Sequence, residues 1–282
     1  MRTIAFPQPL ENLMNTLTRL AALGAVVLAS MACVLPAAAQ QDNMIDTVKA
    51  HGKLQVGFSS FGPGAMRDKK GEWVGFEVDV AGKLAKDLGV KLELIPTAWD
   101  GIIPSLIARK FDVIIGGMSI TPERQQQIDF TAPYSQSGQG VVASKATASG
   151  LKWPDGYNSA KVTMACRRGV MGCKVLEEKF PKATIRQFDD DAIAFQEVMN
   201  GKAQLVIASE PMPTFVMLKN PDKLFKPTPD NVTTSVEGMG VRKGDTASLA
   251  VLNDWIGKNQ AWLKQRHTYW FSTRDWAANV PE

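Results

Sequence analysis

Histidine is scarce in this sequence. The chain of 282 residues contains only two, His51 and His267, which lie far apart. A metal site made of several imidazoles needs more of them, and a Ser-His-Asp triad needs a histidine beside its nucleophile. The sequence therefore excludes a multi-histidine metal site and disfavours a histidine-based triad, and we expect no metal or other cofactor.

Long basic runs are also missing. The 32 basic and 28 acidic residues are scattered along the chain and give a net charge of +4. Nucleic-acid binding normally needs a clustered basic patch, so it is not indicated. With 45% hydrophobic and 21% charged residues, the composition is that of a globular protein, and the length favours one or two domains.

The one long apolar run lies near the N-terminus. Residues 20–36 read LAALGAVVLASMACVLP, with Arg19 before them and three alanines after them. This order is typical of a secretory signal peptide, so we expect residues 1–39 to be removed and the mature protein to be periplasmic. A membrane anchor is the alternative, although the run is slightly short for a membrane span. Translation from Met1 or from Met14 both remain open.

Cysteine is sparse as well. The chain has three, and removal of the signal peptide would leave Cys166 and Cys173, which flank the loop RRGVMG. An even pair in an oxidising compartment favours a disulfide, and two free, partly buried thiols are the alternative.

Strand patterns alternate with helix patterns through the rest of the chain. A polar–apolar alternation or a short β-branched run indicates a strand, whereas apolar residues at helical spacing indicate a helix. Helix boundaries are marked by Gly89 as a C-cap and by Thr121 and Pro122 as N-cap and first helical residue. In the first half, the predicted strands are 53–58, 91–96 and 111–115, and the predicted helices are 78–88, 100–109 and one from Pro122.

The same order repeats in the second half and predicts a second α/β unit. A last strand and a long apolar helix then return to the first unit, which makes two connections between the units, near residues 141–145 and 234–240. The predicted division is 40–141 for the first lobe, 142–236 for the second lobe and 237–282 for the return. The predicted elements here are strands 161–166, 183–188, 203–208 and 238–242, helices 172–179 and 190–200, a helix after residues 211–213, and the long helix around Trp255.

A ligand site is expected in the cleft between the units, because ligands bind beyond the carboxyl ends of parallel strands. The loop GGMSITPER runs from a buried strand into a capped helix, where Arg124 can clamp a carboxylate and Ser119 offers a hydroxyl. Pairing of Arg124 with Glu123, Asp129 or the sheet edge is the alternative. Phe61 and Trp99 lie in neighbouring loops and can sandwich the apolar part of a ligand, although ordinary packing is commoner for such residues.

Four sequence blocks point to a known family: GFEVD (75–79), WDG (99–101), SITPER (119–124) and DFTAPY (129–134). In combination they closely resemble the amino-acid-type periplasmic solute-binding proteins of ABC transporters. The resemblance implies an α/β fold of two lobes, each a mostly parallel sheet with flanking helices, joined by two hinge connections. It also implies a monomer without enzymatic activity that closes on a small ligand and delivers it to a membrane permease.

By resemblance, the ligand carboxylate would be clamped by Arg124, and stacking would come from Phe61 and Trp99. Carboxylate and ammonium would also contact Ser119 and the backbone around Gly117 and Met118. In the second lobe, the corresponding loop consists of Gly169, Val170 and Met171, and the position that pairs with the ligand ammonium is Ser209.

The second lobe departs from the family pattern. The family usually has a Thr or Ser after the glycine of that loop and an Asp at the position of Ser209, while Glu210 is expected to point elsewhere. The site thus loses a negative charge, and Arg167 and Arg168 add positive charge nearby. A standard zwitterionic amino acid would be held less well, which makes a ligand with more negative charge or without an α-ammonium an alternative. Ser59, in place of an Asp, disfavours basic amino acids.

Periplasmic cyclohexadienyl dehydratases share the fold and much of the pattern, so an enzyme is the alternative function. Such enzymes need a general acid in the cleft to expel a hydroxyl group. Their catalytic Glu corresponds approximately to Met212, which cannot donate a proton, and Glu210 is the only acid nearby. The sequence favours the binding protein.

Overall fold

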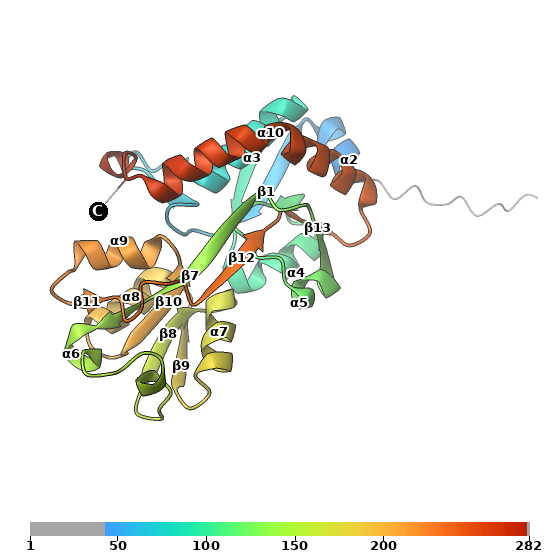
Figure 1. Ribbon diagram of the computed structural model, residues 1–282. Helices are drawn as coiled ribbons and strands as arrows, with labels where there is room; N and C mark the ends of the chain where they lie inside the picture. Colours follow the sequence, from blue (N-terminus) through green and yellow to red (C-terminus); the bar gives the residue numbers. More distant parts are fainter. Residues whose placement is uncertain (1–42, 281–282) are drawn as a thin grey trace, which may run out of the picture. The chain divides into compact units, whose positions relative to one another are not determined.

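The computed structural model describes residues 43–280. The predicted signal peptide and the two possible start sites lie outside these residues. Two sheets, each covered by helices, form the architecture (Figure 1). We call the part built on the five-stranded sheet lobe 1 and the part built on the six-stranded sheet lobe 2.

Lobe 1 has the strand order β4-β1-β5-β13-β6, with β1 parallel to β4 and β5, and β13 antiparallel to β5 and β6. A two-stranded ribbon lies beside this sheet. The strands are β1 (Lys53–Phe58), β2 (Met66–Arg67), β3 (Trp73–Val74), β4 (Lys91–Pro96), β5 (Val113–Ile114), β6 (Ile128–Phe130) and β13 (Gly240–Arg242). The helices are α2 (Met44–His51), α3 (Phe76–Leu88), α4 (Ile102–Ile107), α5 (Pro122–Gln127) and α10 (Thr246–Ser272), with 3-10 turns η1 (Trp99–Gly101) and η3 (Ala277–Asn279).

Lobe 2 has the strand order β11-β7-β10-β8-β9, and β12 also pairs with β7. Strand β8 is parallel to β9 and β10, while β7 is antiparallel to its three partners. The strands are β7 (Ser135–Ser144), β8 (Thr163–Arg167), β9 (Thr184–Phe188), β10 (Leu205–Ser209), β11 (Leu224–Phe225) and β12 (Thr233–Glu237). The helices are α6 (Lys145–Ala148), α7 (Met171–Lys179), α8 (Asp191–Met199) and α9 (Met212–Lys219), with the 3-10 turn η2 (Asp155–Tyr157).

Several local predictions are confirmed with their physical causes. Strands β1 and β4 have the predicted bounds, and α3 ends at Gly89, whose φ of 73° is a left-handed conformation that suits glycine. The side chain of Thr121 accepts a hydrogen bond from the backbone N–H of Arg124 and so caps α5, with Pro122 as its first residue. The helix predicted at 100–109 is shorter, because it starts as the 3-10 turn η1 and continues only through α4.

The first connection between the lobes lies earlier than the sequence indicated. Residues 140–143 of β7 already pair with β10 in lobe 2, and Val141 is fully buried there, so a boundary after residue 141 falls inside a strand. Strands β7 and β12 pair along residues 135–139 and 233–237, and both run between the two sheets (Figure 1). The two connections between the lobes therefore run along β7 and β12, through residues 135–139 and 233–237.

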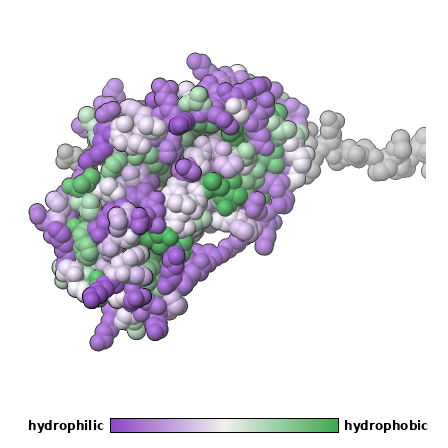
Figure 2. Space-filling view, viewed as in Figure 1, coloured by the Kyte–Doolittle hydropathy of each residue, from purple (hydrophilic) through white to green (hydrophobic). Residues whose placement is uncertain are grey.

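Each lobe has its own apolar core. In lobe 1, α3 and α10 bury Val80, Leu84, Leu252 and Ile256 against the sheet and against one another. Apolar residues on the face shown in Figure 2 form separate patches among hydrophilic ones. Within residues 43–280, no helix is both long and apolar enough to cross a membrane.

The disulfide predicted between Cys166 and Cys173 is present, with the two Cα atoms 5.4 Å apart. It joins the end of β8 to α7 and closes the loop that contains Gly169, Val170 and Met171. The sulfur of Cys173 also lies 2.8 Å from the carbonyl oxygen of Arg167. This is a close contact and not a hydrogen bond, because a disulfide sulfur carries no proton.

Replacing Cys166 and Cys173 together by alanine should lower the free energy of unfolding by about 2 kcal/mol, because the bond constrains only a short loop in the unfolded chain. Urea denaturation of both proteins measures this difference. A reducing agent should shift the wild-type midpoint in the same direction and leave the double variant unchanged. An unaltered wild-type midpoint under reduction would contradict the bond.

Candidate functional site

A cavity of about 30 Å³ lies between the lobes, and most of the residues predicted to bind a ligand line it. Its volume is sufficient for only a water molecule or two. A small organic ligand can therefore enter only if the lobes move apart. The lining residues are Phe61, Trp99, Gly116, Gly117, Ser119 and Arg124 from lobe 1, and Gln139, Arg167, Val170, Met171 and Ser209 from lobe 2.

Two predicted residues lie elsewhere. Met118 is 1% exposed and belongs to an apolar cluster of lobe 1, and Gly169 is on the surface of lobe 2. Both border a second, larger opening of about 560 Å³, which shares Trp99, Arg124, Val170 and Met171 with the cavity. The smaller cavity is the better candidate site, because most of the predicted residues line it and because buried polar side chains from both lobes, Ser119, Gln139 and Arg167, converge on it.

Arg124 reaches from α5 across the gap between the lobes. Its Nη1 donates to the carbonyl oxygen of Ser119 at 2.9 Å and its Nη2 to that of Gly169 at 3.2 Å. Burial lowers the pKa of Arg124 from its usual value, and the neighbouring charge of Glu123 opposes this shift. In the part of the chain that the structure describes, the guanidinium forms no ion pair. Glu123 and Asp129 pair with lysines instead. Of the alternative partners, only the sheet edge is contacted, because the carbonyl oxygen that accepts from Arg124 belongs to Ser119, which forms a β-bridge with Glu237.

The backbone of the loop at residues 116–119 is more occupied than the sequence indicated. The N–H of Gly117 donates to the hydroxyl of Tyr134 at 3.2 Å, and the hydroxyl of Ser119 lies 3.0 Å from that of Ser235. Helix α5 has only six residues and is already capped by Thr121. In the segment formed by this loop and α5, the guanidinium of Arg124 is therefore the main group available to an anion.

Two aromatic residues form part of the lobe 1 wall. Trp99 is 8% exposed and packs in the same apolar cluster as Met118. The ring of Phe61 folds back onto its own turn, where a Cβ at Gly64 would lie 2.0 Å from it, and it also approaches Gly117. Both rings thus pack against the protein and also line the cavity.

The lobe 2 loop touches lobe 1 through its backbone. Gly169 has a φ of +76°, and a Cβ there would lie 3.2 Å from the Cα of Asp100. Glycine is thus required both by the conformation and by the close approach. Val170 occupies the N-cap position of α7 without a capping side chain, so the first N–H groups of this helix lack a side-chain acceptor.

Ser209 ends β10 beside the buried amide of Gln139. The Nε2 of Gln139 donates to the Oγ of Ser209 at 2.9 Å, and its Oε1 is buried without a partner among residues 43–280. Glu210 points away, as the sequence indicated. Its Oε1 accepts from the Nζ of Lys226 at 2.7 Å, and its Oε2 accepts from the hydroxyl of Thr214 at 2.8 Å.

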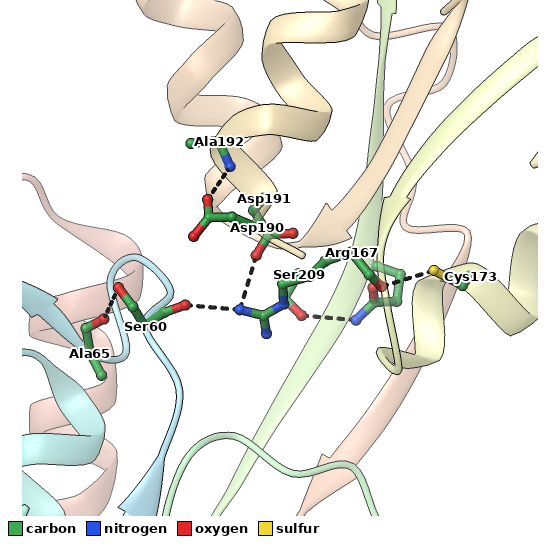
Figure 3. Close-up of polar contacts among 9 residues, drawn as sticks. Ser60, Ala65, Arg167, Cys173, Asp190, Asp191, Ala192 and Ser209 are labelled. Carbon is green, nitrogen blue, oxygen red and sulfur yellow. Dashed lines mark hydrogen bonds and ion pairs between the residues drawn. The ribbon is translucent and has the colours of Figure 1, made fainter. Parts of the chain in front are cut away.

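Arg167 is the most buried charge of the lobe 2 wall, at 6% exposure. Its Nη1 donates to the carbonyl oxygen of Ser60 in lobe 1 at 2.8 Å and lies 3.5 Å from the Oδ2 of Asp191 (Figure 3). The sequence placed Arg167 near the site but did not select it, and it did not select Gln139. An isolated polar residue in an apolar strand, as Gln139 is in QGVVAS, is the signal that could have found it.

Two buried carboxyl groups lie behind the loop at residues 116–119. Glu77 and Glu237 are 1% and 4% exposed, and the hydroxyl of Tyr134 donates to Glu77 at 2.6 Å. The hydroxyl of Ser135 donates to Glu237 at 2.5 Å. Burial, and secondly the charge of Glu237, raises the pKa of Glu77 to about 8, and burial also raises the pKa of Glu237. Glu77 is therefore protonated near pH 7. It lies beside Tyr134, the residue that precedes β7 in the strand pair that joins the lobes.

The comparisons with known proteins agree with this architecture. Residues 54–273 match the bacterial extracellular solute-binding proteins, family 3, and the chain belongs to this family. It adopts the α/β fold of two-lobed periplasmic binding proteins.

Individual relatives are of two kinds. The chain is 28% identical to the L-cystine-binding protein TcyJ of Escherichia coli, over 86% of this chain and 91% of that protein. It is 27% identical to the cyclohexadienyl dehydratase of Pseudomonas aeruginosa, over 88% and 93% of the two chains. Among solved structures, a putative ABC-transporter binding component from Wolinella succinogenes, complexed with lysine, has a TM-score of 0.75 at 34% identity, with 81% and 99% coverage. An ancestral amino acid-binding protein, described as a precursor of cyclohexadienyl dehydratase, has a TM-score of 0.73 at 35% identity, with 80% and 99% coverage.

The raised pKa of Glu77 predicts how stability depends on pH. Between 4.5 and about 8 the carboxyl group is protonated in the folded protein and ionised in the unfolded chain. The folded state then binds more protons, so the free energy of unfolding should fall with rising pH across this window, by up to about 1.4 kcal/mol per pH unit. Glu77→Gln keeps a partner for Tyr134 and should flatten the dependence, as urea titrations at several pH values would measure. The exposed Glu178→Gln is the control, and an equal slope in Glu77→Gln and wild type would refute the assignment.

Proposed function

We propose that this protein is the extracytoplasmic solute-binding component of an ABC importer and that it binds an amino acid or a related small carboxylate between its lobes. The observation that carries the proposal is the guanidinium of Arg124, which lies in the interlobe cleft and has only carbonyl oxygens as partners. A partly buried cation without an anion is electrostatically unsatisfied, and a ligand carboxylate would satisfy it.

The remaining predicted residues support this role around the same ligand. Trp99 and Phe61 would contact its apolar part, and Ser119 would add a hydroxyl. In lobe 2, Val170 and Met171 would approach the carboxylate through backbone groups, with Ser209 at the far end. Gly169 would contribute through its carbonyl oxygen, which accepts from Arg124. Gly117 and Met118 would contribute mainly by holding the loop in position.

Ligand binding would be coupled to lobe movement. The cavity of about 30 Å³ cannot admit a small carboxylate, and each lobe contributes part of its wall. A ligand that contacts both lobes stabilises the closed arrangement relative to an open one. The paired strands β7 and β12 would form the hinge. In the sequence, lobe 1 precedes β7 and resumes after β12.

The wider context follows from the family. A signal peptide ending at residue 39, a periplasmic location, delivery to a membrane permease and a monomeric state belong to this proposal. Relatives that bind cystine and lysine, by their names, support an amino acid or a related compound as the ligand.

The dehydratase relative makes an enzyme the second candidate, but the site argues against it. Met212 stands where the resemblance places the catalytic acid, and a thioether cannot donate a proton. Glu210, the neighbouring acid, is held by Lys226 and Thr214. Among the residues that line the cavity, none carries a carboxyl group.

Arg124→Ala should nearly abolish ligand binding and leave the fold intact. Loss of one charged partner in a desolvated site costs about 2–5 kcal/mol, which is about 30-fold to several thousand-fold in affinity. Arg124→Lys should retain only part of the wild-type affinity, because an ammonium lacks the two-donor fork of a guanidinium. Calorimetry with a ligand found by thermal-shift screening of amino acids and organic acids measures the effect, with the exposed Arg168→Ala as control. Wild-type affinity in Arg124→Ala would place the site elsewhere.

Ser209→Asp tests whether this position faces a ligand ammonium. A carboxylate there should raise the affinity for zwitterionic amino acids about tenfold or more and lower that for the corresponding carboxylates without the amino group. Ser149→Asp adds the same charge to an exposed position of lobe 2 and should change neither affinity. If both variants behave alike, Ser209 does not lie at the ammonium position.

A further inference from the structure

A second guanidinium faces the cavity from lobe 2. Arg167 is the last residue of β8 and lines the same cavity as Arg124. The central guanidinium carbons of Arg124 and Arg167 lie 5.8 and 5.6 Å from the ring centroid of Trp99. Two cations thus approach one indole ring, each from a different lobe. The ring attracts each cation, but the two guanidinium groups have no anion between them that they share.

The contacts of Arg167 involve only one of its three guanidinium nitrogens. Nη1 alone contacts Ser60 and Asp191, as Figure 3 shows. Nε is buried without a partner among residues 43–280. The guanidinium contacts within these residues, to Ser60 and Asp191, both involve Nη1, so Nη2 is unused as well. Nε and Nη2 form one edge of the planar group, and such an edge binds a carboxylate through two parallel hydrogen bonds. Arg167 therefore presents an unused two-donor edge.

The wall around this edge carries little negative charge. Ser209 carries no charge, and Glu210 is neutralised by Lys226. Among residues 43–280, Asp191 is the acid that pairs with Arg167, and Asp190 precedes it. Asp191 is the first residue of α8, where the partial positive charge of the helix end shares in its neutralisation. The cavity thus favours an added anion and offers no charged partner for an ammonium.

We propose that Arg167 is a second anion-binding residue and that the ligand is a small dicarboxylate without an α-ammonium. One carboxylate binds Arg124 of lobe 1, the other binds the Nε–Nη2 edge of Arg167 of lobe 2, and the chain between them lies against Trp99. The inference rests on the proposed function, because it requires that a ligand bind between the lobes. To the proposed function it adds the chemical class of the ligand and the residue that selects this class.

The test compares ligands of equal chain length by calorimetry. Succinate, glutarate and adipate are the dicarboxylates, and each is paired with its monocarboxylate (butyrate, valerate, hexanoate) and its α-amino counterpart (aspartate, glutamate, α-aminoadipate). At least one dicarboxylate should bind the wild-type protein about tenfold more tightly than both of its counterparts. If no dicarboxylate binds, or if the α-amino counterpart binds more tightly, the proposal is wrong.

The variant that tests the residue is Arg167→Gln/Asp191→Asn. It removes both charges together, so that no unpaired carboxylate is left buried. The double variant should lose about tenfold or more in affinity for the dicarboxylate and keep its affinity for the monocarboxylate. Arg167→Lys retains the charge without the two-donor edge and should fall in between. Arg168→Gln is the matched control, because Arg168 is half exposed and pairs with the exposed Asp189.

The outcomes separate this inference from the proposed function. Equal losses for the dicarboxylate and the monocarboxylate in the double variant would show a structural role for Arg167 and overturn the inference. An unchanged preference for the dicarboxylate in a double variant whose fold is intact would also overturn the inference. If Arg124→Ala still abolishes binding in those cases, the interlobe site stands without the second anchor. Binding that is insensitive to Arg124→Ala would refute the proposed function itself.

Discussion

The pairing of β7 with β12 is the constraint on which the site depends. The chain passes between the two sheets along this antiparallel pair, and the pair also holds the cavity wall in place. Ser235 of β12 contacts the hydroxyl of Ser119, and the carbonyl oxygen of Glu237 accepts from the backbone of Tyr134. Any rotation of one lobe against the other must pass through these strands, so ligand contacts in the cleft and backbone geometry at the hinge are mechanically linked.

Electrostatics give the cleft its chemical character. Burial separates Arg124 and Arg167 from water, and the protein supplies carbonyl oxygens and one carboxylate at 3.5 Å as their partners. Such an arrangement is costly unless an anion completes it, because the hydration lost on burial is only partly replaced. Glu77, which lies close behind, avoids a similar cost by a different route. Burial, and secondly the charge of Glu237, raises the pKa of Glu77 to about 8, so this carboxyl group stays neutral near pH 7.

Much of the fold was predictable because its determinants are local. The alternation in β1 and β4, the glycine after α3 and the Thr-Pro start of α5 act within a few residues, and each has the predicted structure. The boundary at residue 141 was wrong because an apolar run does not reveal which sheet it joins. Pairing with β10 decided that, and β10 lies more than 60 residues further along the chain.

The sequence by itself determined the class of fold, the loops that border the cleft, the cysteine pair and Arg124 as the anion-binding candidate. These follow from periodicity, capping residues and short motifs. Only the tertiary structure decided that Arg167 and Gln139 line the same cavity, that Glu210 turns to Lys226, and that the N–H of Gly117 is occupied by Tyr134. The reason is physical: these partners come from separate strands and helices, and hydrogen bonds and charges act through distance in space, which a linear pattern of residues does not contain.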